Sequence, residues 1–209
     1  MSARASILER VRRAQRTGRI PAGNPGAIVR QTVMAPLEGE EVLARFSGEL
    51  TALGVEHYVE DSAAGVRARI NTLVGDHSVL AWDADRLPYA VGESLASAVY
   101  GSSPRDVQAA AEIGLTGCDG AIAETGSLAL LSRRGQPRVA SLLPPVHVAV
   151  VRRGDLRPTM GTFFEEFAQE IAGASCCTFV TGPSRTADIE LTLTLGVHGP
   201  GKVIVVVGP

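Results

Sequence analysis

Hydrophobic positions in the first half of the chain alternate between helical and strand-like spacing. Apolar residues recur every three or four positions over residues 37–53 and 63–73, which predicts two helices that each turn one face inward. A short alternating segment at residues 55–59 and a further segment at residues 78–82 predict the strands that follow these helices. Helices that alternate with strands in this way favour an α/β layered sandwich with a mostly parallel sheet.

The second half of the chain contains more strand-like than helical segments. Runs that are apolar, or that alternate between apolar and polar residues, predict strands over residues 115–123, 128–131, 139–143, 146–151, 177–180, 189–197 and 202–207. Helical spacing predicts helices over residues 93–100, 105–113 and 162–172. These segments continue the same layered arrangement.

The N-terminal segment differs from the rest of the chain. Arginines surround an apolar stripe at helical spacing that consists of Ile7, Leu8, Val11 and Ala14. Residues 20–36 contain several prolines and glycines without periodicity, which indicates an extended arm. We therefore expect an amphipathic helix and arm over residues 1–36, and one α/β domain over residues 37–209.

Composition and charge narrow the class of protein. Of the 209 residues, 45% are hydrophobic and 20% are charged, which is ordinary for a soluble globular domain. A net charge of −2 gives no electrostatic basis for binding nucleic acid. No apolar run approaches the roughly 18 residues of a membrane span, and the N-terminus has no apolar signal-peptide core. We expect a cytoplasmic protein that binds neither nucleic acid nor membrane.

A polar segment near the C-terminus, residues 181–190, is the first candidate site. It follows the predicted strand 177–180, and ligands of open α/β sheets bind beyond such strand ends. The segment also carries two carboxylates, but its donors for a carboxylate or phosphate ligand are the side chains of Ser184, Arg185 and Thr186, because hydroxyls donate hydrogen bonds and arginine grips two oxygens at once. The candidate substrate-binding residues are Gly182, Ser184, Arg185, Thr186, Asp188 and Glu190. A polar surface turn that caps a short helix explains the same residues equally well.

A second candidate site lies between two predicted strands. Thr125-Gly126 is typical of a tight turn in which Gly126 has a positive φ, and both residues are candidates for ligand binding. Glu124 stands at a strand end where it can face a cleft, so it is a candidate catalytic residue. The alternative is that these residues only form a hairpin turn.

Two histidines join Glu124 as catalytic candidates. His147 follows a proline break in an apolar strand, and His198 lies in the C-terminal motif; either imidazole could act as a base. For His147 the alternative is a hydrogen-bonded residue of the core.

Cysteines and missing motifs limit the cofactor chemistry. The three cysteines, Cys118, Cys176 and Cys177, include no C-x-x-C pair, so the chain alone lacks the four thiolates of a usual iron–sulfur cluster. The sequence has no Gly-rich nucleotide loop, no H-E-x-x-H and no nucleophile elbow. The histidines have unrelated spacings, so no metal site is indicated. We expect no cofactor on this chain.

Both candidate motifs resemble segments of one known family. Residues 117–128, GCDGAIAETGSL, resemble the hallmark segment of the LUD domain. Residues 181–190, TGPSRTADIE, and 197–200, VHGP, are similar to its C-terminal signature. Many members have Thr where Ser127 stands, a change that keeps a hydroxyl. The resemblance covers essentially the whole chain, and the Arg-bearing N-terminal helix fits the short members of the family.

The resemblance implies both a fold and a role. The implied fold is like that of the sugar-phosphate isomerase and CoA-transferase superfamily, whose ligands bind at strand ends. The implied role is in the oxidation of L-lactate to pyruvate with two partners, the iron–sulfur lactate-utilization proteins A and B, which would carry the clusters. The leading hypothesis is an accessory or substrate-binding subunit in which Ser184, Arg185 and Thr186 hold a small carboxylate.

Two other functions stay open. A stand-alone enzyme of the isomerase or acyl- and CoA-transfer type would use Glu124 as base or nucleophile and residues 181–186 to bind a phosphate. A structural scaffold would use the Arg-rich N-terminal helix to bind its partners. The residues alone leave open whether this chain is itself an enzyme.

Overall fold

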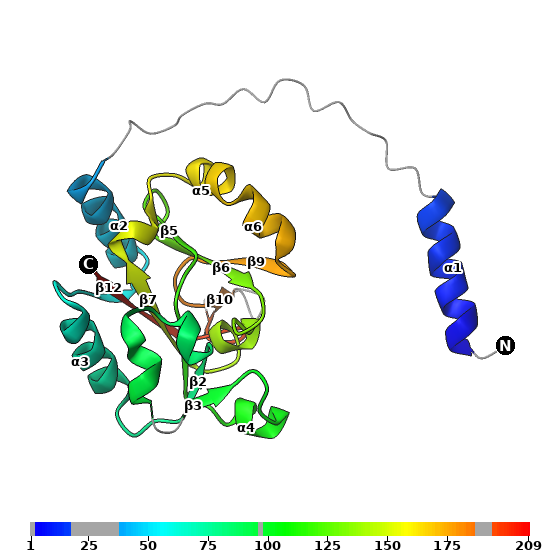
Figure 1. The fold of residues 1–209 in the computed structure, drawn as a ribbon, viewed down its shortest axis with the longest axis horizontal. Helices are drawn as coiled ribbons and strands as arrows, with labels where there is room; N and C mark the ends of the chain where they lie inside the picture. Colours follow the sequence, from blue (N-terminus) through cyan, green and yellow to red (C-terminus); the bar gives the residue numbers. More distant parts are fainter. Residues whose placement is uncertain (1–2, 18–37, 96–97, 187–193) are drawn as a thin grey trace. The chain divides into compact units, whose positions relative to one another are not determined.

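The computed structural model describes residues 3–17, 38–95, 98–186 and 194–209 (Figure 1). The chain divides into two compact units, Met1–Ala35 and Pro36–Pro209. In the first unit, α1 (Ala3–Thr17) is a helix with an exposed apolar stripe, as its spacing predicts. The predicted arm over residues 20–36 lies outside the described residues.

The second unit is built on a six-stranded sheet in which all neighbouring strands are parallel. In spatial order its strands are β1 (Glu56–Val59), β12 (Lys202–Gly208), β7 (Val146–Arg152), β4 (Ile113–Thr116), β2 (Val79–Ala81) and β3 (Ala98–Tyr100). The register of β12 on β7 places Val203 opposite His147. The predicted α/β class with a mostly parallel sheet is confirmed.

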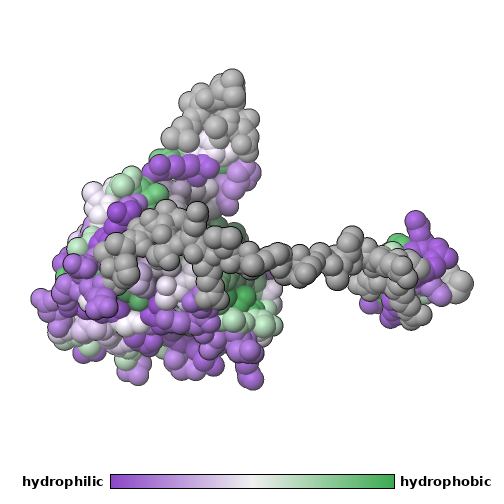
Figure 2. Space-filling view, turned by 90° about the horizontal axis from the view of Figure 1, so that it is seen from above, coloured by the Kyte–Doolittle hydropathy of each residue, from purple (hydrophilic) through white to green (hydrophobic). Residues whose placement is uncertain are grey.

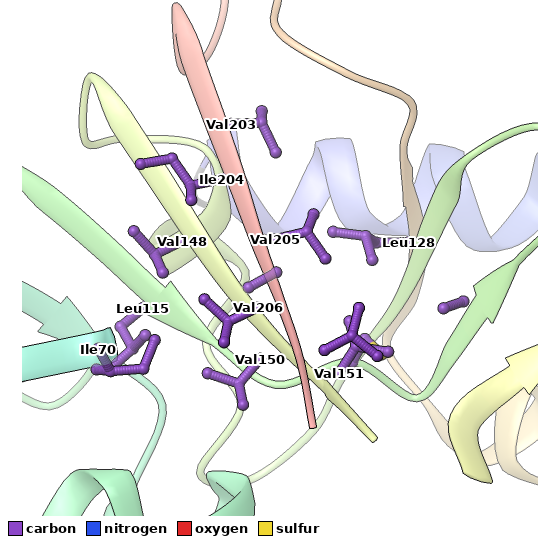
Figure 3. Packing of buried hydrophobic residues seen from close by; sticks show 14 of the residues in the cluster. Ile70, Leu115, Leu128, Val148, Val150, Val151, Val203, Ile204, Val205 and Val206 are labelled. Atoms are coloured by element: carbon purple, nitrogen blue, oxygen red, sulfur yellow. The ribbon is translucent and has the colours of Figure 1, made fainter. Parts of the chain in front are cut away.

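The middle strands of this central sheet are runs of branched apolar residues, as expected where a parallel sheet is buried on both faces. Successive side chains of β12 point to opposite sides, as Ile204 and Val205 do in Figure 3. Val205 has no exposed surface and belongs to the same buried cluster as Ile70 and Leu128. Outside this core, hydrophilic residues dominate the face drawn in Figure 2, and hydrophobic residues form small patches.

Helices α2 (Glu40–Ala52) and α3 (Ala63–Val74) add their apolar faces to this core. The buried residues of α2 have the spacing that predicts the helix. Ser62 is the N-cap of α3, and its hydroxyl accepts a hydrogen bond from the Gly65 N–H at 3.0 Å. The shorter helices are η1 (Ala84–Arg86), η2 (Pro88–Ser94), α4 (Arg105–Ala109), η3 (Arg138–Ser141) and η4 (Arg153–Asp155). No helix among the described residues is long and apolar enough to cross a membrane.

A second sheet of four strands carries the motif at residues 117–128 and leads into the C-terminal motif. In spatial order its strands are β8 (Leu156–Arg157), β5 (Gly120–Ile122), β6 (Ser127–Ser132) and β9 (Cys176–Val180). β6 is antiparallel to β5 and to β9, whereas β5 and β8 are parallel. Helices α5 (Met160–Glu166) and α6 (Ala168–Gly173) run beside this sheet in Figure 1, and the buried Phe163 packs edge-on against Phe179 of β9.

Two predicted segments have a different secondary structure. The predicted helix over residues 93–100 is wrong at its end, because residues 98–100 pair with β2 and form β3. The predicted strand over residues 139–143 is wrong because the segment enters η3 directly after Pro137, whose fixed φ suits the first turn of a helix. In the first case long-range strand pairing overrides the local helical spacing, and in the second a local proline effect overrides the apolar run.

Three further segments are shorter than their patterns predict. The predicted helix over residues 105–113 ends at Ala109, and the predicted helix over residues 162–172 is divided at Phe167. The predicted strand over residues 115–123 is two strands, β4 and β5, in different sheets. Most of the predicted strand 189–197 lies outside the described residues.

Candidate functional site

A row of three hydroxyl groups links the two sequence motifs. Thr125 lies in the turn between β5 and β6, Ser127 begins β6, and Thr181 directly follows β9. The Ser127 Oγ atom lies 2.7 Å from Thr125 Oγ1 and 2.7 Å from Thr181 Oγ1. Ser127 is buried, whereas Thr181 is exposed. These three residues, which we call the hydroxyl cluster, therefore lead from the inside of the sheet to its surface.

The hydroxyl cluster forms because β6 pairs with a strand on each side. Its Leu128 lies opposite Ala121 of β5 and Val180 of β9, which brings the turn and the end of β9 to one edge. The C-terminal motif follows the end of β9, as predicted, but β9 belongs to the second sheet and is antiparallel to β6. Ser127 was not among the predicted site residues, although it carries a hydroxyl within the motif at residues 117–128.

Gly126 lets the end of α2 approach the hydroxyl cluster. Its φ is +64°, a left-handed value that glycine adopts readily, and this confirms the predicted tight turn. A Cβ atom at this position would lie 3.0 Å from both Glu49 Cβ and Leu53 Cδ1. The turn therefore needs glycine for its backbone angle and for its packing.

Arg185 reaches the same end of α2 from the C-terminal motif. Its Nη2 donates a hydrogen bond to the carbonyl oxygen of Leu53 at 2.5 Å, and Leu53 is the C-cap of the helix. A Cβ atom at Gly182 would lie 3.3 Å from Leu53 Cβ. Gly126, Gly182 and Arg185 therefore all lie next to Leu53. Arg185 is nevertheless exposed, which leaves other N–H groups of its guanidinium accessible.

The rest of the C-terminal motif forms a ribbon of two short antiparallel strands, β10 (Arg185–Thr186) and β11 (Thr194–Leu195). The Ser184 N–H donates to the Pro200 carbonyl at 2.8 Å, and the Ser184 carbonyl accepts from the Gly196 N–H at 2.9 Å. The motif therefore folds back on itself beside the hydroxyl cluster.

The ribbon separates the remaining candidates of this motif. Thr186 is buried, at 8% exposed, so its hydroxyl is not on the open surface. His198 is exposed on the loop that returns to Ser184. Asp188 and Glu190 lie outside the described residues.

Glu124 faces α5 rather than the hydroxyl cluster. Its Oε1 accepts a hydrogen bond from the Met160 N–H at 2.7 Å, and its own N–H donates to the Pro158 carbonyl at 3.1 Å. Met160 is the first residue of α5, whose N–H has no acceptor within the helix. This contact gives Glu124 a structural task as a helix cap.

His147 is fully buried in the central sheet and lines no surface. Its Nε2 lies 2.9 Å from Thr116 Oγ1, and its Nδ1 has no hydrogen-bond partner among the described residues. Desolvation lowers the pKa of His147 to about 4, so the imidazole is neutral near neutral pH. The geometry favours the alternative that His147 is a core residue.

The arrangement suits binding better than chemistry. In the described part of the chain, the hydrogen bonds of the hydroxyl cluster join the three hydroxyls to one another and none reaches an imidazole or carboxylate. An activated nucleophile needs such a base. Exposed hydroxyl and guanidinium groups instead provide donors for a carboxylate or phosphate.

Comparisons with known proteins agree with the motifs. The model of the LUD domain matches residues 93–207. A lactate utilization protein C of Anoxybacillus flavithermus is 31% identical over 188 residues, which are 85% of this chain and 84% of that protein. A protein of the same name from Halalkalibacterium halodurans is 40% identical over 101 residues, which are 46% of this chain and only 44% of that protein.

A solved structure has a similar fold. It is that of a DUF162 family protein from Deinococcus radiodurans, which is 26% identical to this chain. The superposition covers 83% of this chain and all of that protein, with a TM-score of 0.67.

Proposed function

This chain belongs to the LUD domain family, and from that premise we propose that it serves lactate utilization as a subunit that binds a small carboxylate. The relatives named lactate utilization protein C support the role in lactate utilization. The proposed binding role rests on the exposed Arg185. Its side chain donates to Leu53, and the turn of the hydroxyl cluster packs against the same Leu53. A guanidinium and hydroxyl donors on one surface fit the two oxygens of a carboxylate.

The electrons would pass through partner proteins, the iron–sulfur lactate-utilization proteins A and B. Cys118 is buried, and burial raises the pKa of its thiol, so this residue is a poor source of thiolate. Cys176 and Cys177 are adjacent on β9, and neighbouring side chains of a strand point to opposite faces. These positions do not suit the thiolate set of a cluster within this chain.

The test is the replacement Arg185→Ala in cells that depend on lactate for growth. We expect slower growth on lactate, unchanged growth on another carbon source, and unchanged recovery of partners with the tagged chain. Arg134→Ala is the matched control, because Arg134 is also an exposed arginine of the same unit. Equal growth of the Arg185→Ala and wild-type strains on lactate would refute the assignment of this residue.

The alternative, an isomerase or a transferase of acyl groups or CoA, makes Glu124 the base or nucleophile. The hydrogen bond from Met160 to Glu124 offers a structural reason for this carboxylate instead. Glu124→Gln separates the two, because glutamine keeps the acceptor oxygen but loses the basic carboxylate. We expect Glu124→Gln to retain growth on lactate; complete loss of growth by a stably folded variant would favour the enzyme.

A cytoplasmic location stays a prediction.

A further inference from the structure

A second group of polar side chains surrounds an open pocket of about 870 Å³ that neither motif includes. Three separate segments line it: α4 with the loop before it, the segment that runs from the end of β6 past η3, and the start of β9 with the residue before it. The pocket lies at the other end of the β6–β9 pair from the hydroxyl cluster, because Ser132 lies opposite Cys176 there. Ser132 lies five steps along β6 from Ser127, so the two sites are about 17 Å apart.

Buried contacts hold these segments together. The Gln108 side chain of α4 is 9% exposed, and its Nε2 donates to the carbonyl oxygens of Gly101 at 3.1 Å and Ser103 at 2.6 Å. A Cβ atom at Gly101 would lie 2.6 Å from Pro137 Cβ, so only glycine lets this loop approach the turn so closely. The pocket is therefore a built feature of the fold.

The pocket has an excess of positive charge. Its lining includes Arg105, Arg133 and Arg138 and no aspartate or glutamate. Asp119 balances Arg133, with 2.6 Å between Asp119 Oδ1 and Arg133 Nη2. Arg105 and Arg138 have no carboxylate partner among the described residues, and Arg138 Nη1 instead lies 3.6 Å from Cys176 Sγ. Two guanidinium charges are left without a counter-charge.

We propose that this pocket binds an organic anion with at least two negative charges, either a phosphate ester or a dicarboxylate. Two arginines match two charges, since a guanidinium binds phosphate and carboxylate with the same fork of N–H groups. The walls beside the arginines are aliphatic, formed by Ala109, Pro137, Val139 and Leu143. Among the described lining residues none is aromatic, so the body of the ligand is aliphatic rather than a stacked ring. This site is independent of the function proposed for the hydroxyl cluster.

Cys176 provides a built-in reporter of the pocket. Hydrogen bonds from Thr178 and then from Arg138 lower the pKa of the Cys176 thiol, which favours the reactive thiolate. A bound anion would engage Arg138 and add negative charge beside the sulfur. Alkylation of Cys176 by iodoacetamide should therefore slow when the pocket is filled, while Cys177, on the other face of β9, should not respond.

The experiment measures binding of inorganic pyrophosphate and of succinate to the full chain by calorimetry. We expect Arg105→Ala and Arg138→Ala each to weaken binding about tenfold and the double variant about a hundredfold. Arg105 is exposed and its side chain makes no hydrogen bond or ion pair within the described residues, so its replacement should not disturb folding. Arg134→Ala is the control, because Arg134 is adjacent in sequence and exposed but does not line the pocket.

Binding of pyrophosphate alone would favour a phosphate ester as the ligand, and binding of succinate alone would favour a dicarboxylate. Either result supports the pocket if the anion also slows alkylation of Cys176. The proposal is overturned if neither anion binds at about 10 mM, a concentration that detects even weak sites, or if Arg134→Ala weakens binding as much as Arg105→Ala. Arg185→Ala should leave the affinities for pyrophosphate and succinate unchanged. A negative result for this pocket would therefore not bear on the role proposed for Arg185 in lactate utilization.

Discussion

The middle strands of the central sheet and the edge strand β9 of the second sheet differ in how far their polar groups are buried. In the central sheet, Val205, Val206 and Val207 of β12 have no exposed surface, and the polar group His147 is sealed inside. In the second sheet, every residue of β9 is partly exposed, and polar groups gather at both ends of its pairing with β6. The middle strands of the central sheet are closed by apolar packing, whereas β9, at the edge of the second sheet, leaves room for ligands at both of its ends.

The largest effect expected is on the stability of the central sheet. Leu115 is fully buried on β4, so Leu115→Ala should lower the free energy of unfolding by about 3 kcal/mol, through lost burial and a residual cavity. Val180→Ala on the half-buried β9 should lower it by about 1 kcal/mol. Urea denaturation measures both changes. Equal losses would show that the two sheets do not differ in this way.

A pH dependence of similar size should come from His147. The unfolded imidazole binds a proton below about pH 6.5, whereas the folded one binds it only below about pH 4, so unfolding takes up a proton between these values. The free energy of unfolding should therefore fall as the pH falls from 6.5 to 4, by about 3 kcal/mol in total. His147→Gln should flatten this slope relative to wild type. An unchanged slope in His147→Gln would contradict the burial of a neutral imidazole.

The turn of the hydroxyl cluster gives a smaller stability effect. Gly126→Ala should lower the free energy of unfolding by about 2 kcal/mol, because a Cβ atom meets α2 and the φ is left-handed. Gly154→Ala is the matched control, since a Cβ atom there has no neighbour within 4 Å, and thermal unfolding compares the two. A neutral Gly126→Ala would mean that α2 does not pack against this turn.

The smallest effect is expected on the reactivity of Cys176, which lies beside Arg138 in the arginine-lined pocket, when no ligand is bound. Arg138→Ala removes one of the hydrogen bonds that lower the pKa of Cys176, so the rate of alkylation at pH 7 should fall about threefold. The pH profile of the rate should move to higher pH, and Arg134→Ala should leave it in place. An unchanged pH profile would show that Arg138 does not influence the pKa of the Cys176 thiol.

Local sequence patterns predicted the helices and strands that form the buried core. The apolar runs of β7 and β12 and the spacing of the buried residues of α2 are direct consequences of a closed core. Residues 98–100 were mistaken for part of a helix, because only pairing with β2 makes them a strand. Local spacing does not encode such long-range partners.

The same limit applies to the candidate site. The turn at Gly126 follows from short-range turn chemistry and was predicted. The contact between Arg185 and Leu53 joins residues 132 positions apart, and no sequence pattern indicates it. Asp119, bound to Arg133, and the thiol beside Arg138 likewise come together only in the folded chain.

The most direct test of the proposed function is titration of the isotope-labelled full chain with L-lactate, followed by amide chemical shifts. We expect the largest changes at Thr125, Ser127, Thr181 and Arg185, with little change at Arg105 and Arg138. Changes confined to the arginine-lined pocket, or no change at any amide, would contradict a carboxylate site at the hydroxyl cluster.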